Sequence, residues 1–307
     1  MKQELKEYDL AIIGSGVAGM SAGIYALRYE MSTIIFGDEF GGTIAKTHLV
    51  ENYPGFSSIS GMDLGNNVQK HLEEVGGKVN FEKIERVERQ GSEFLLNDKY
   101  SVKSIIIATG TKSRKLDAKN ILNLENKGVS YCATCDGPLF KDKVVGVVGG
   151  SDSAAKEALL LSKYAQKVYI FYRKSEIRAE PINKKRVQNE KKIEIVTNVN
   201  IKECPGEKAL EKVILDNGKV INVQGLFIEI GRMPHNEIAK SLGVNLNEKG
   251  EILVDSNMKT NVEAVFAAGD VCEGHFKQAI VSAAQGSLAA ESAFRYAEDF
   301  LILAEKK

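Results

Sequence analysis

Residues 8–19 read Tyr-Asp-Leu-Ala-Ile-Ile-Gly-Ser-Gly-Val-Ala-Gly, a short apolar run followed by the pattern G-x-G-x-x-G. The apolar run is typical of a buried parallel strand, and the residues after the glycines are predicted to form a helix. Gly14 permits the tight turn, Gly16 lets a diphosphate approach the backbone, and Gly19 lets the helix pack on the strand. The N-terminus of that helix offers free N–H groups to phosphates. The stretch predicts a dinucleotide-binding α/β fold; the alternative is a strand–turn–helix that binds no ligand.

A second copy of this pattern begins at Gly149. Residues 143–148 are predicted to form its strand and residues 155–163 its helix, with the turn Gly149-Gly150-Ser151-Asp152-Ser153-Ala154 between them. The turn follows G-x-G-x-x-A, with Ser151 where the middle glycine is expected. Because a side chain there crowds a diphosphate, the alternative for this copy is a nucleotide fold that binds little.

The residues that follow each fingerprint indicate which nucleotide it binds. An acid about 20 positions after the first glycine selects NAD, whereas basic residues accommodate the 2′-phosphate of NADP. Arg173, Lys174 and Arg178 cluster after the predicted strand 167–171, which favours NADP. The alternative is that these long cations only extend into solvent at a strand end. After the first copy, residues 35–42 are glycine-rich and hold no basic residue.

Two further strand ends carry glycine. Residues 104–110 are an apolar strand ending in Ala-Thr-Gly, and residues 265–270 are another ending in Gly-Asp. Gln278 and Ala279 open a predicted helix shortly afterwards. An acid at the carboxyl end of a strand can hold a ribityl hydroxyl, and a helix N-terminus can support the electron density of a flavin. The order of these features along the chain indicates a flavin site.

Residues 132–137 read Cys-Ala-Thr-Cys-Asp-Gly, a C-x-x-C pair with an acid directly after it. Cysteines at this spacing can close a small disulfide, and their thiolates are acidified relative to a free thiol. Beside a flavin or nicotinamide site, the pair predicts an electron relay; the alternative is two inert buried thiols. Asp136 is a candidate for proton transfer, which requires only hydrogen-bond reach. Its alternative role is that of a turn residue before Gly137 and Pro138.

The composition bounds the remaining possibilities. A chain of 307 residues is long enough for two domains. Lys+Arg and Asp+Glu both number 41, so no global field indicates nucleic acid or a membrane surface. Four cysteines are too few for a secreted disulfide scaffold of this size, and no apolar run is long enough to span a bilayer. We expect a cytoplasmic protein without nucleic-acid or membrane partners.

A metal site is the other chemistry that the cysteines allow. Cys272 and His275 form a C-x-x-H pair, which together with Cys132 and Cys135 could supply the Cys₃His ligands of zinc. The C-x-x-H pair directly follows Gly269-Asp270, where flavin contacts are expected. No metal is therefore predicted.

With these features in place, the chain resembles the low-molecular-weight thioredoxin reductases, FAD-containing members of the pyridine nucleotide-disulfide oxidoreductases. The most specific match is the Cys-Ala-Thr-Cys-Asp-Gly block. The other matching residues are Gly14-Ser15-Gly16, Gly41-Gly42, residues 50–55, Ala108-Thr109-Gly110, residues 149–154, Arg173-Lys174, Arg178-Ala179, Ile230-Gly231, Gly269-Asp270 and Lys277-Gln278-Ala279. The chain departs from the family pattern at Ser151, Tyr172, Lys174 and Lys277. The first three of these lie in the pyridine-nucleotide site.

The resemblance implies an α/β protein of two Rossmann-like three-layer nucleotide-binding domains. An FAD domain is expected over 1–113 and 245–307, split by an inserted NADPH domain over 114–244 that carries the dithiol. The residues implied to contact FAD are Gly14, Ser15, Gly16, Ala18, Gly19, Gly37, Asp38, Gly41, Gly42, Asn52, Thr109, Gly110, Gly269, Asp270, Lys277, Gln278 and Ala279. Those implied to contact NADP are Gly150, Ser151, Asp152, Ser153, Ala154, Arg173, Lys174 and Arg178.

The resemblance also implies a function. Cys135 would exchange electrons with the flavin, Cys132 would attack the disulfide of thioredoxin, and Asp136 would donate and accept the proton. The family is implied to act as a homodimer in which one domain rotates. One alternative is a related flavin disulfide reductase with ferredoxin or NADH as donor, motivated by Ser151. Another is a non-catalytic nucleotide-binding redox sensor.

Overall fold

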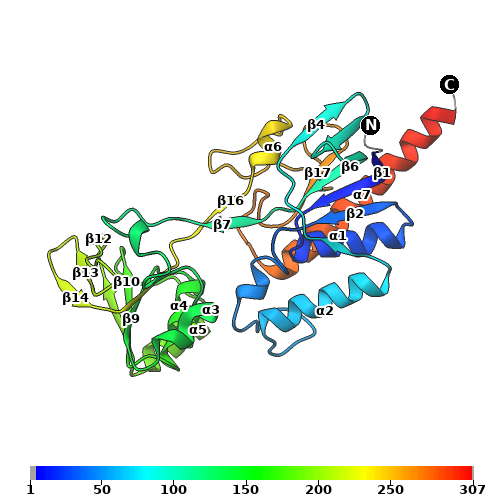
Figure 1. The fold of residues 1–307 in the computed structure, drawn as a ribbon. Coiled ribbons are helices and arrows are strands. Elements are labelled where there is room, and N and C mark those ends of the chain that lie inside the picture. Colours follow the sequence, from blue (N-terminus) through cyan, green and yellow to red (C-terminus); the bar gives the residue numbers. More distant parts are fainter. Residues whose placement is uncertain (1–4, 306–307) are drawn as a thin grey trace. The chain divides into compact units, whose positions relative to one another are not determined.

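The computed structural model describes residues 5–305, which form two compact units joined by two chain crossings (Figure 1). Unit 1 comprises Met1–Lys112 and Met233–Lys307, and unit 2 comprises Ser113–Arg232. The crossings lie in the short strands β7 (Thr111–Ser113) and β16 (Arg232–Pro234), which pair with each other. Unit 1 is therefore assembled from the two ends of the chain, and unit 2 is a continuous insertion.

The second crossing lies earlier in the chain than the boundary at 244/245 that the sequence suggested. Residues 233–244 belong to unit 1 because Ile238, Ala239 and Val244 are buried in one of its hydrophobic clusters. Helix α6 (Glu237–Ser241) carries the first two of these residues. Short apolar segments of this kind leave no boundary signal in the sequence.

The sheet of unit 1 has the strand order β3-β2-β1-β6-β5-β4, with β17 also paired to β6. Strands β4 and β5 form an antiparallel hairpin, whereas β1, β2, β3, β6 and β17 are mutually parallel. Strand β6 joins the antiparallel hairpin to the parallel core, because β5 pairs with it antiparallel. The strand bounds are β1 (Lys6–Ile13), β2 (Thr33–Phe36), β3 (Val79–Asn80), β4 (Val87–Gln90), β5 (Glu93–Leu96), β6 (Tyr100–Ile107) and β17 (Val265–Ala267).

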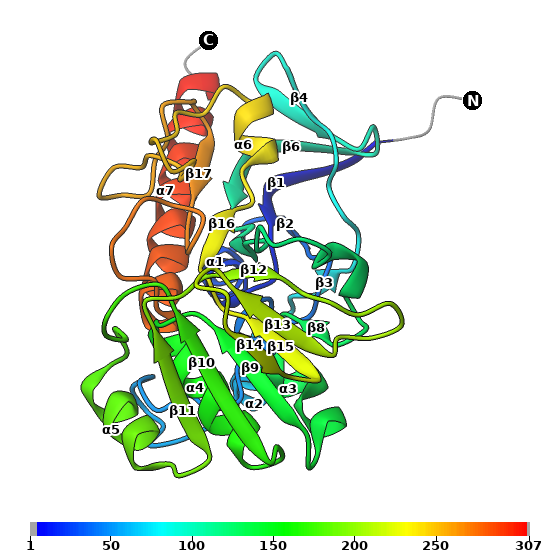
Figure 2. The ribbon, with the colours of Figure 1, turned by 90° about the vertical axis from the view of Figure 1, so that its left-hand side faces the viewer.

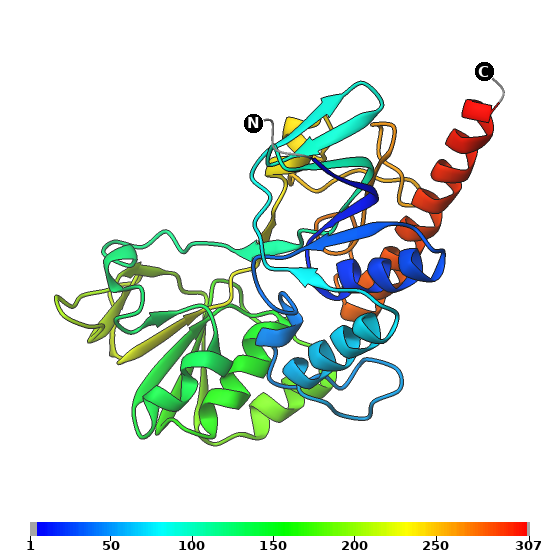
Figure 3. The same cartoon turned by 45° about the vertical axis from the view of Figure 1, so that its right-hand side comes forward.

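Successive side chains of β1 point to opposite faces of this sheet. Leu10 and Ile12 pack into the cluster under the long helices, whereas Ala11 and Ile13 pack into the cluster shared with the β4–β5 hairpin and α6. Figure 3 shows the blue helix α1 and the red helix α7 against each other beside the sheet. The helices are α1 (Val17–Arg28), the 3₁₀ turn η1 (Ile44–Lys46), α2 (Gly61–Glu74) and α7 (Ala279–Glu305).

Unit 2 contains a parallel sheet of order β11-β10-β9-β15-β8, whose strands β9, β10 and β11 lie side by side in Figure 2. A separate antiparallel sheet has the order β12-β13-β14. The strands are β8 (Val129–Ser130), β9 (Val144–Val148), β10 (Lys167–Tyr172), β11 (Ile193–Thr197), β12 (Ile201–Glu203), β13 (Lys212–Leu215), β14 (Val220–Asn222) and β15 (Gly225–Ile228). The helices are η2 (Leu122–Leu124), α3 (Ala133–Asp136), η3 (Gly137–Phe140), α4 (Asp152–Ser162) and α5 (Pro181–Asn189).

Unit 2 has three layers. Val145 and Val147 of β9 face the cluster built with α4 and α5, and Val148 with Phe171 faces the cluster built with the antiparallel sheet. The predicted α/β architecture is confirmed. Helix α5 begins at Pro181, and proline is well suited to the first turn of a helix.

The packing of α1 on α7 makes a stability prediction. A Cβ atom at Gly286 of α7 would lie 2.1 Å from the carbonyl oxygen of Ala18 in α1, so the helices must separate to admit it. We expect Gly286→Ala to destabilise unit 1 by about 1–3 kcal/mol, measured by chemical denaturation. The control is Ser287→Ala, whose hydroxyl bonds only the carbonyl of Ala284 in the same helix; equal stability of the two variants would contradict the prediction.

Candidate functional site

The first fingerprint is a glycine turn pressed against its neighbours. Gly14 has φ +124°, and a Cβ there would lie 2.1 Å from the carbonyl oxygen of Ala108. A Cβ at Gly19 would lie 1.8 Å from the oxygen of Gly14, whereas one at Gly16 would meet nothing closer than Gly41 O at 3.9 Å. Gly16 is also the N-cap of α1 and makes no side-chain capping bond. An open backbone at an uncapped helix N-terminus fits a diphosphate group.

Ser15 braces this turn. Its hydroxyl donates to the carbonyl oxygen of Glu39 at 2.8 Å, and a Cβ at Gly37 would lie 2.0 Å from the Ser15 oxygen. Gly16 and Gly41 form an isolated parallel bridge. The segment that follows β2 therefore lies beside the first fingerprint. Asp38 in this segment is exposed.

The other residues predicted to contact FAD lie at neighbouring strand ends of unit 1. A Cβ at Gly269, after β17, would lie 2.9 Å from the Cβ of Ala18. The hydroxyl of Thr109, after β6, donates to the carbonyl oxygen of His235 at 2.6 Å. Because β1, β6 and β17 are parallel, these segments meet at one edge of the sheet, where ligands of open α/β sheets bind.

A groove of about 390 Å³ lies beside Gly269 and Asp270. Lys277 lines it, but its ammonium donates to the carbonyl oxygens of Asp270 and Cys272 and pairs with Glu251 at 3.0 Å. This lysine therefore holds the loop together. Separately, the Nδ2 of Asn52 donates to Oε1 of Gln278 at 3.1 Å, next to Ala279, the first residue of α7.

The second fingerprint has a similar turn in unit 2. A Cβ at Gly149, where φ is +149°, would lie 2.1 Å from the carbonyl oxygen of Glu229. One at Gly150 would lie 2.5 Å from the ring of Tyr172, so that ring packs on the turn. Ser151 is the N-cap of α4, makes no capping bond and is exposed. The helix N-terminus is thus available to a phosphate, with the Ser151 side chain beside it.

Asp152 is engaged within the protein. Its Oδ1 accepts from the N–H of Glu180 at 3.1 Å and from Nδ2 of Asn183 at 2.8 Å, and its Oδ2 pairs with Lys156 at 2.9 Å. Burial raises the pKa of Asp152, but the hydrogen bonds from Lys156 and Asn183 outweigh it and the net pKa shift is downward. Asp152 therefore joins α4 to α5. In the same turn Ser153 is exposed and Ala154 is buried.

The three cations predicted to read a 2′-phosphate differ in their surroundings. Arg178 donates from Nε to the hydroxyl of Tyr172 at 3.0 Å, and its N–H donates to the oxygen of Gly150 at 2.6 Å. Arg173 and Lys174 are exposed directly after β10. Arg178 is therefore held against the fingerprint turn, whereas Arg173 and Lys174 are exposed.

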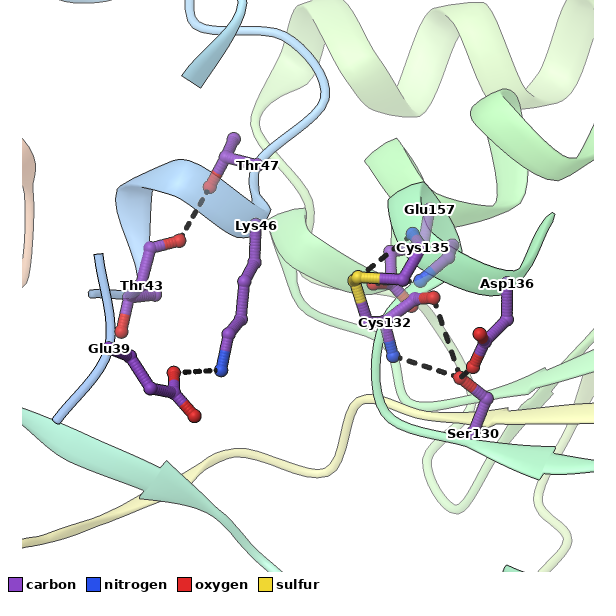
Figure 4. Close-up of a disulfide and its surroundings, with 10 residues drawn as sticks. Glu39, Thr43, Lys46, Thr47, Ser130, Cys132, Cys135, Asp136 and Glu157 are labelled. Carbon is purple, nitrogen blue, oxygen red and sulfur yellow. Dashed lines mark hydrogen bonds and ion pairs between the residues drawn. A yellow bond between two sulfur atoms is a disulfide. The ribbon is translucent and has the colours of Figure 1, made fainter. Parts of the chain in front are cut away.

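The C-x-x-C pair lies at the start of the short helix α3 (Figure 4). Cys132 and Cys135 are joined by a disulfide, with their Cα atoms 5.4 Å apart. The N–H of Cys135 points at the sulfur of Cys132, 3.2 Å away, and Cys135 is the more exposed of the two residues. The first turn of α3 thus directs a backbone N–H donor at the Cys132 sulfur.

Asp136 is linked to Cys132 through Ser130. The Ser130 hydroxyl lies 2.6 Å from Oδ2 of Asp136, and it accepts the N–H of Cys132 at 3.1 Å (Figure 4). Asp136 is half-buried at this position. The carboxylate, the hydroxyl and the cysteine backbone thus form one hydrogen-bonded chain within unit 2.

An acidic pair beside the dithiol, Glu157 and Glu229, was not predicted from the sequence; both residues are half-buried. Oε1 of Glu157 in α4 accepts the N–H of Ala133 at 3.2 Å, and its buried Oε2 has no hydrogen-bond partner. Burial and the charge of Glu229 raise the pKa of Glu157 to about 8. Burial raises the pKa of Glu229 to about 7, although Arg232 opposes the shift. The signal that could have found Glu229 is its position between apolar residues at the end of β15.

The remaining cysteines are Cys204 and Cys272, both buried free thiols. Burial raises the pKa of Cys204 to about 11 and that of Cys272 to about 12, so both stay neutral near pH 7. Within residues 5–305, no three His, Cys, Asp or Glu side chains gather where they could hold a metal ion. In the same residues, no helix has the length and apolar character needed to span a membrane.

Comparison with known proteins gives this geometry its context. The family model for pyridine nucleotide-disulphide oxidoreductases matches residues 8–286. Thioredoxin reductase of Bacillus subtilis is 36% identical over 307 residues, covering 96% of each chain. The structure of Lactococcus lactis thioredoxin reductase has a TM-score of 0.91 at 35% identity, covering 95% of this chain and 99% of that one. A ferredoxin-flavin thioredoxin reductase from Clostridium acetobutylicum is 34% identical with a TM-score of 0.54, covering 97% of this chain and 100% of that one. The chain belongs to the pyridine nucleotide-disulphide oxidoreductase family.

Proposed function

We propose that this protein is an NADPH-dependent thioredoxin reductase. FAD held by unit 1 would carry electrons from NADPH to the Cys132–Cys135 pair, which would pass them to the disulfide of thioredoxin. The observation that carries the proposal is a closed C-x-x-C disulfide in the same unit as a dinucleotide turn. The relatives from Bacillus subtilis and Lactococcus lactis bear the name thioredoxin reductase, which supports it.

Unit 1 supplies the groups that would hold FAD, whose role when bound is to carry two electrons. The N–H groups at the start of α1 would bind the diphosphate, since Gly16 adds no side chain there. Asp270 lies beside the groove after β17, where its carboxylate can accept from a ribityl hydroxyl. The tight turn at Gly14 fixes the start of α1 relative to the sheet, and Gly269, next to Asp270, packs against Ala18 of that helix.

The dithiol then performs thiol–disulfide exchange. In the reduced protein, the thiolate of Cys132 attacks the thioredoxin disulfide, which breaks that bond and forms a mixed disulfide. The sulfur of Cys135 next attacks Cys132, which restores the protein disulfide and releases reduced thioredoxin. Asp136 accepts the proton that Cys135 loses. The hydrogen-bonded chain through Ser130 holds Asp136 at this position.

The electron donor has a second candidate. Ser151 adds a side chain at the pyridine-nucleotide turn, and Arg178 already donates a hydrogen bond to Tyr172. The similar protein from Clostridium acetobutylicum is named as a ferredoxin-flavin thioredoxin reductase. Reduced ferredoxin is therefore the alternative donor. A homodimer and a cytoplasmic location stay predictions.

Rapid mixing with nucleotides tests the donor. We expect anaerobic NADPH to bleach the flavin absorbance faster than NADH, because Arg173 and Lys174 bind the 2′-phosphate. Arg173→Ala and Lys174→Ala each remove one cation from that phosphate, so each should weaken NADPH binding about 10- to 150-fold and leave NADH binding unchanged. The control is Lys208→Ala, another exposed cation of unit 2. Bleaching by reduced ferredoxin and by neither nucleotide would replace the first donor with the second.

Trapping of a mixed disulfide tests the thiol roles. We expect Cys135→Ser to accumulate a covalent adduct with thioredoxin through Cys132, because the second exchange step is removed. Cys132→Ser should form no adduct, and Cys204→Ser should turn over normally because Cys204 is buried. Non-reducing electrophoresis and mass spectrometry detect the adduct. An adduct with Cys132→Ser alone would reverse the assignment.

A further inference from the structure

The acidic pair Glu157 and Glu229 lies beside the dithiol but takes no part in the steps above. Glu157 is attached to the dithiol segment directly, because its Oε1 accepts the N–H of Ala133, the residue after Cys132. Its Oε2 is buried and unpaired, an arrangement that disfavours a charged carboxylate. Glu229 follows β15, and its carbonyl oxygen lies against Gly149. The pair therefore lies between the dithiol helix and the dinucleotide turn of unit 2.

Few other charges act on this pair. Glu229 and Arg232 are the charged groups whose fields act on Glu157. The other charged side chains on or next to elements packed against α4 have partners of their own or are exposed: Asp136 with Ser130, Lys156 with Asp152, Arg186 with Asn183, Lys184 with Glu176, Lys167 with Glu194, and Lys192 with the carbonyl oxygens of Ser162 and Ala165, while Lys185 of α5 is exposed. The proton affinity of the Glu157–Glu229 pair therefore depends on the repulsion between the two carboxylates, on the charge of Arg232 and on any charge that forms at the dithiol.

We propose that the Glu157–Glu229 pair binds a proton when the reduced dithiol forms its thiolate and releases that proton when the disulfide closes. On reduction the S–S bond takes up two electrons from the donor, leaving one thiol and one thiolate. The thiol takes one proton from water and the acidic pair takes the second. This inference rests on the proposed function for its donor, but the proton linkage is a property of the dithiol itself.

The physical reason is repulsion between like charges. A thiolate at the start of α3 raises the proton affinity of carboxylates nearby, and by reciprocity a charged pair opposes the thiolate. Because the pKa values of Glu229 and Glu157 are raised to about 7 and about 8, the pair becomes charged as the pH rises through this range. Replacing it with neutral amides should therefore favour reduction above pH 8 and have no such effect at pH 6. Glu157 acts here as a positioning residue, through charge.

The test is the equilibrium of the purified holoprotein with dithiothreitol between pH 6 and 9. Acid quenching and alkylation count the thiols of Cys132 and Cys135 by mass. We expect Glu157→Gln to have the wild-type equilibrium constant at pH 6 and one shifted toward the dithiol by up to about tenfold at pH 9, or about 30 mV. Glu207→Gln is the matched control, an exposed acid of the same unit, and should follow the wild type throughout.

A merely structural role is excluded by the shape of the pH profile. A variant that only distorts α3 shifts the equilibrium constant by the same factor at every pH, and that outcome would overturn the proposal. Glu229→Gln repeats the test without touching the bond to Ala133, in case Glu157→Gln does not fold. Since the assay uses neither nucleotide nor thioredoxin, a failed turnover assay leaves its result intact.

Discussion

The interaction on which the rest of the structure depends is the packing of backbone against backbone at the two glycine turns. At Gly14 and at Gly149 the chain approaches a neighbouring segment so closely that a Cβ would lie 2.1 Å from a carbonyl oxygen. Each turn ends a parallel strand and starts a helix, so this approach sets where the helix N-terminus lies. In unit 1 the same constraint brings the end of β6 beside the turn, and in unit 2 it brings the end of β15. The positions of the two sheet edges that would hold nucleotides therefore depend on Gly14 and Gly149, which have no side chains.

Much of the architecture follows from local sequence. The two apolar runs, their glycines and the helices after them predicted β1, α1, β9 and α4, because a buried parallel strand and its turn have a strong signature. The C-x-x-C spacing predicted a disulfide, and the structure has it. The roles of individual site residues, such as Asp136 or Arg173, stay predictions.

The features that could not be predicted from the sequence depend on tertiary contacts. Nothing in the local pattern shows that Asp152 is used to join α4 and α5, since its partners Glu180 and Asn183 are far along the chain. The contact of Glu157 with Ala133 likewise forms only when α4 packs against α3, and nothing in the sequence of α4 distinguishes Glu157 from an ordinary surface acid. The boundary of unit 1 was placed too late for the same reason, because α6 is short and its apolar residues find their partners only in the folded sheet.

The discontinuity of unit 1 has a consequence for synthesis. Unit 2 is continuous, so all its strands are translated before β17 and α7 of unit 1. Until these two elements are added, residues 105–107 of β6 lack their partner strand, and the face of the sheet that carries Leu10 and Ile12 is covered by α1 without α7. Exposed apolar faces and open strand edges are the features that chaperones bind and that drive aggregation. The nascent chain therefore carries a complete unit 2 on an unfinished sheet of unit 1 for the time needed to translate its last segment.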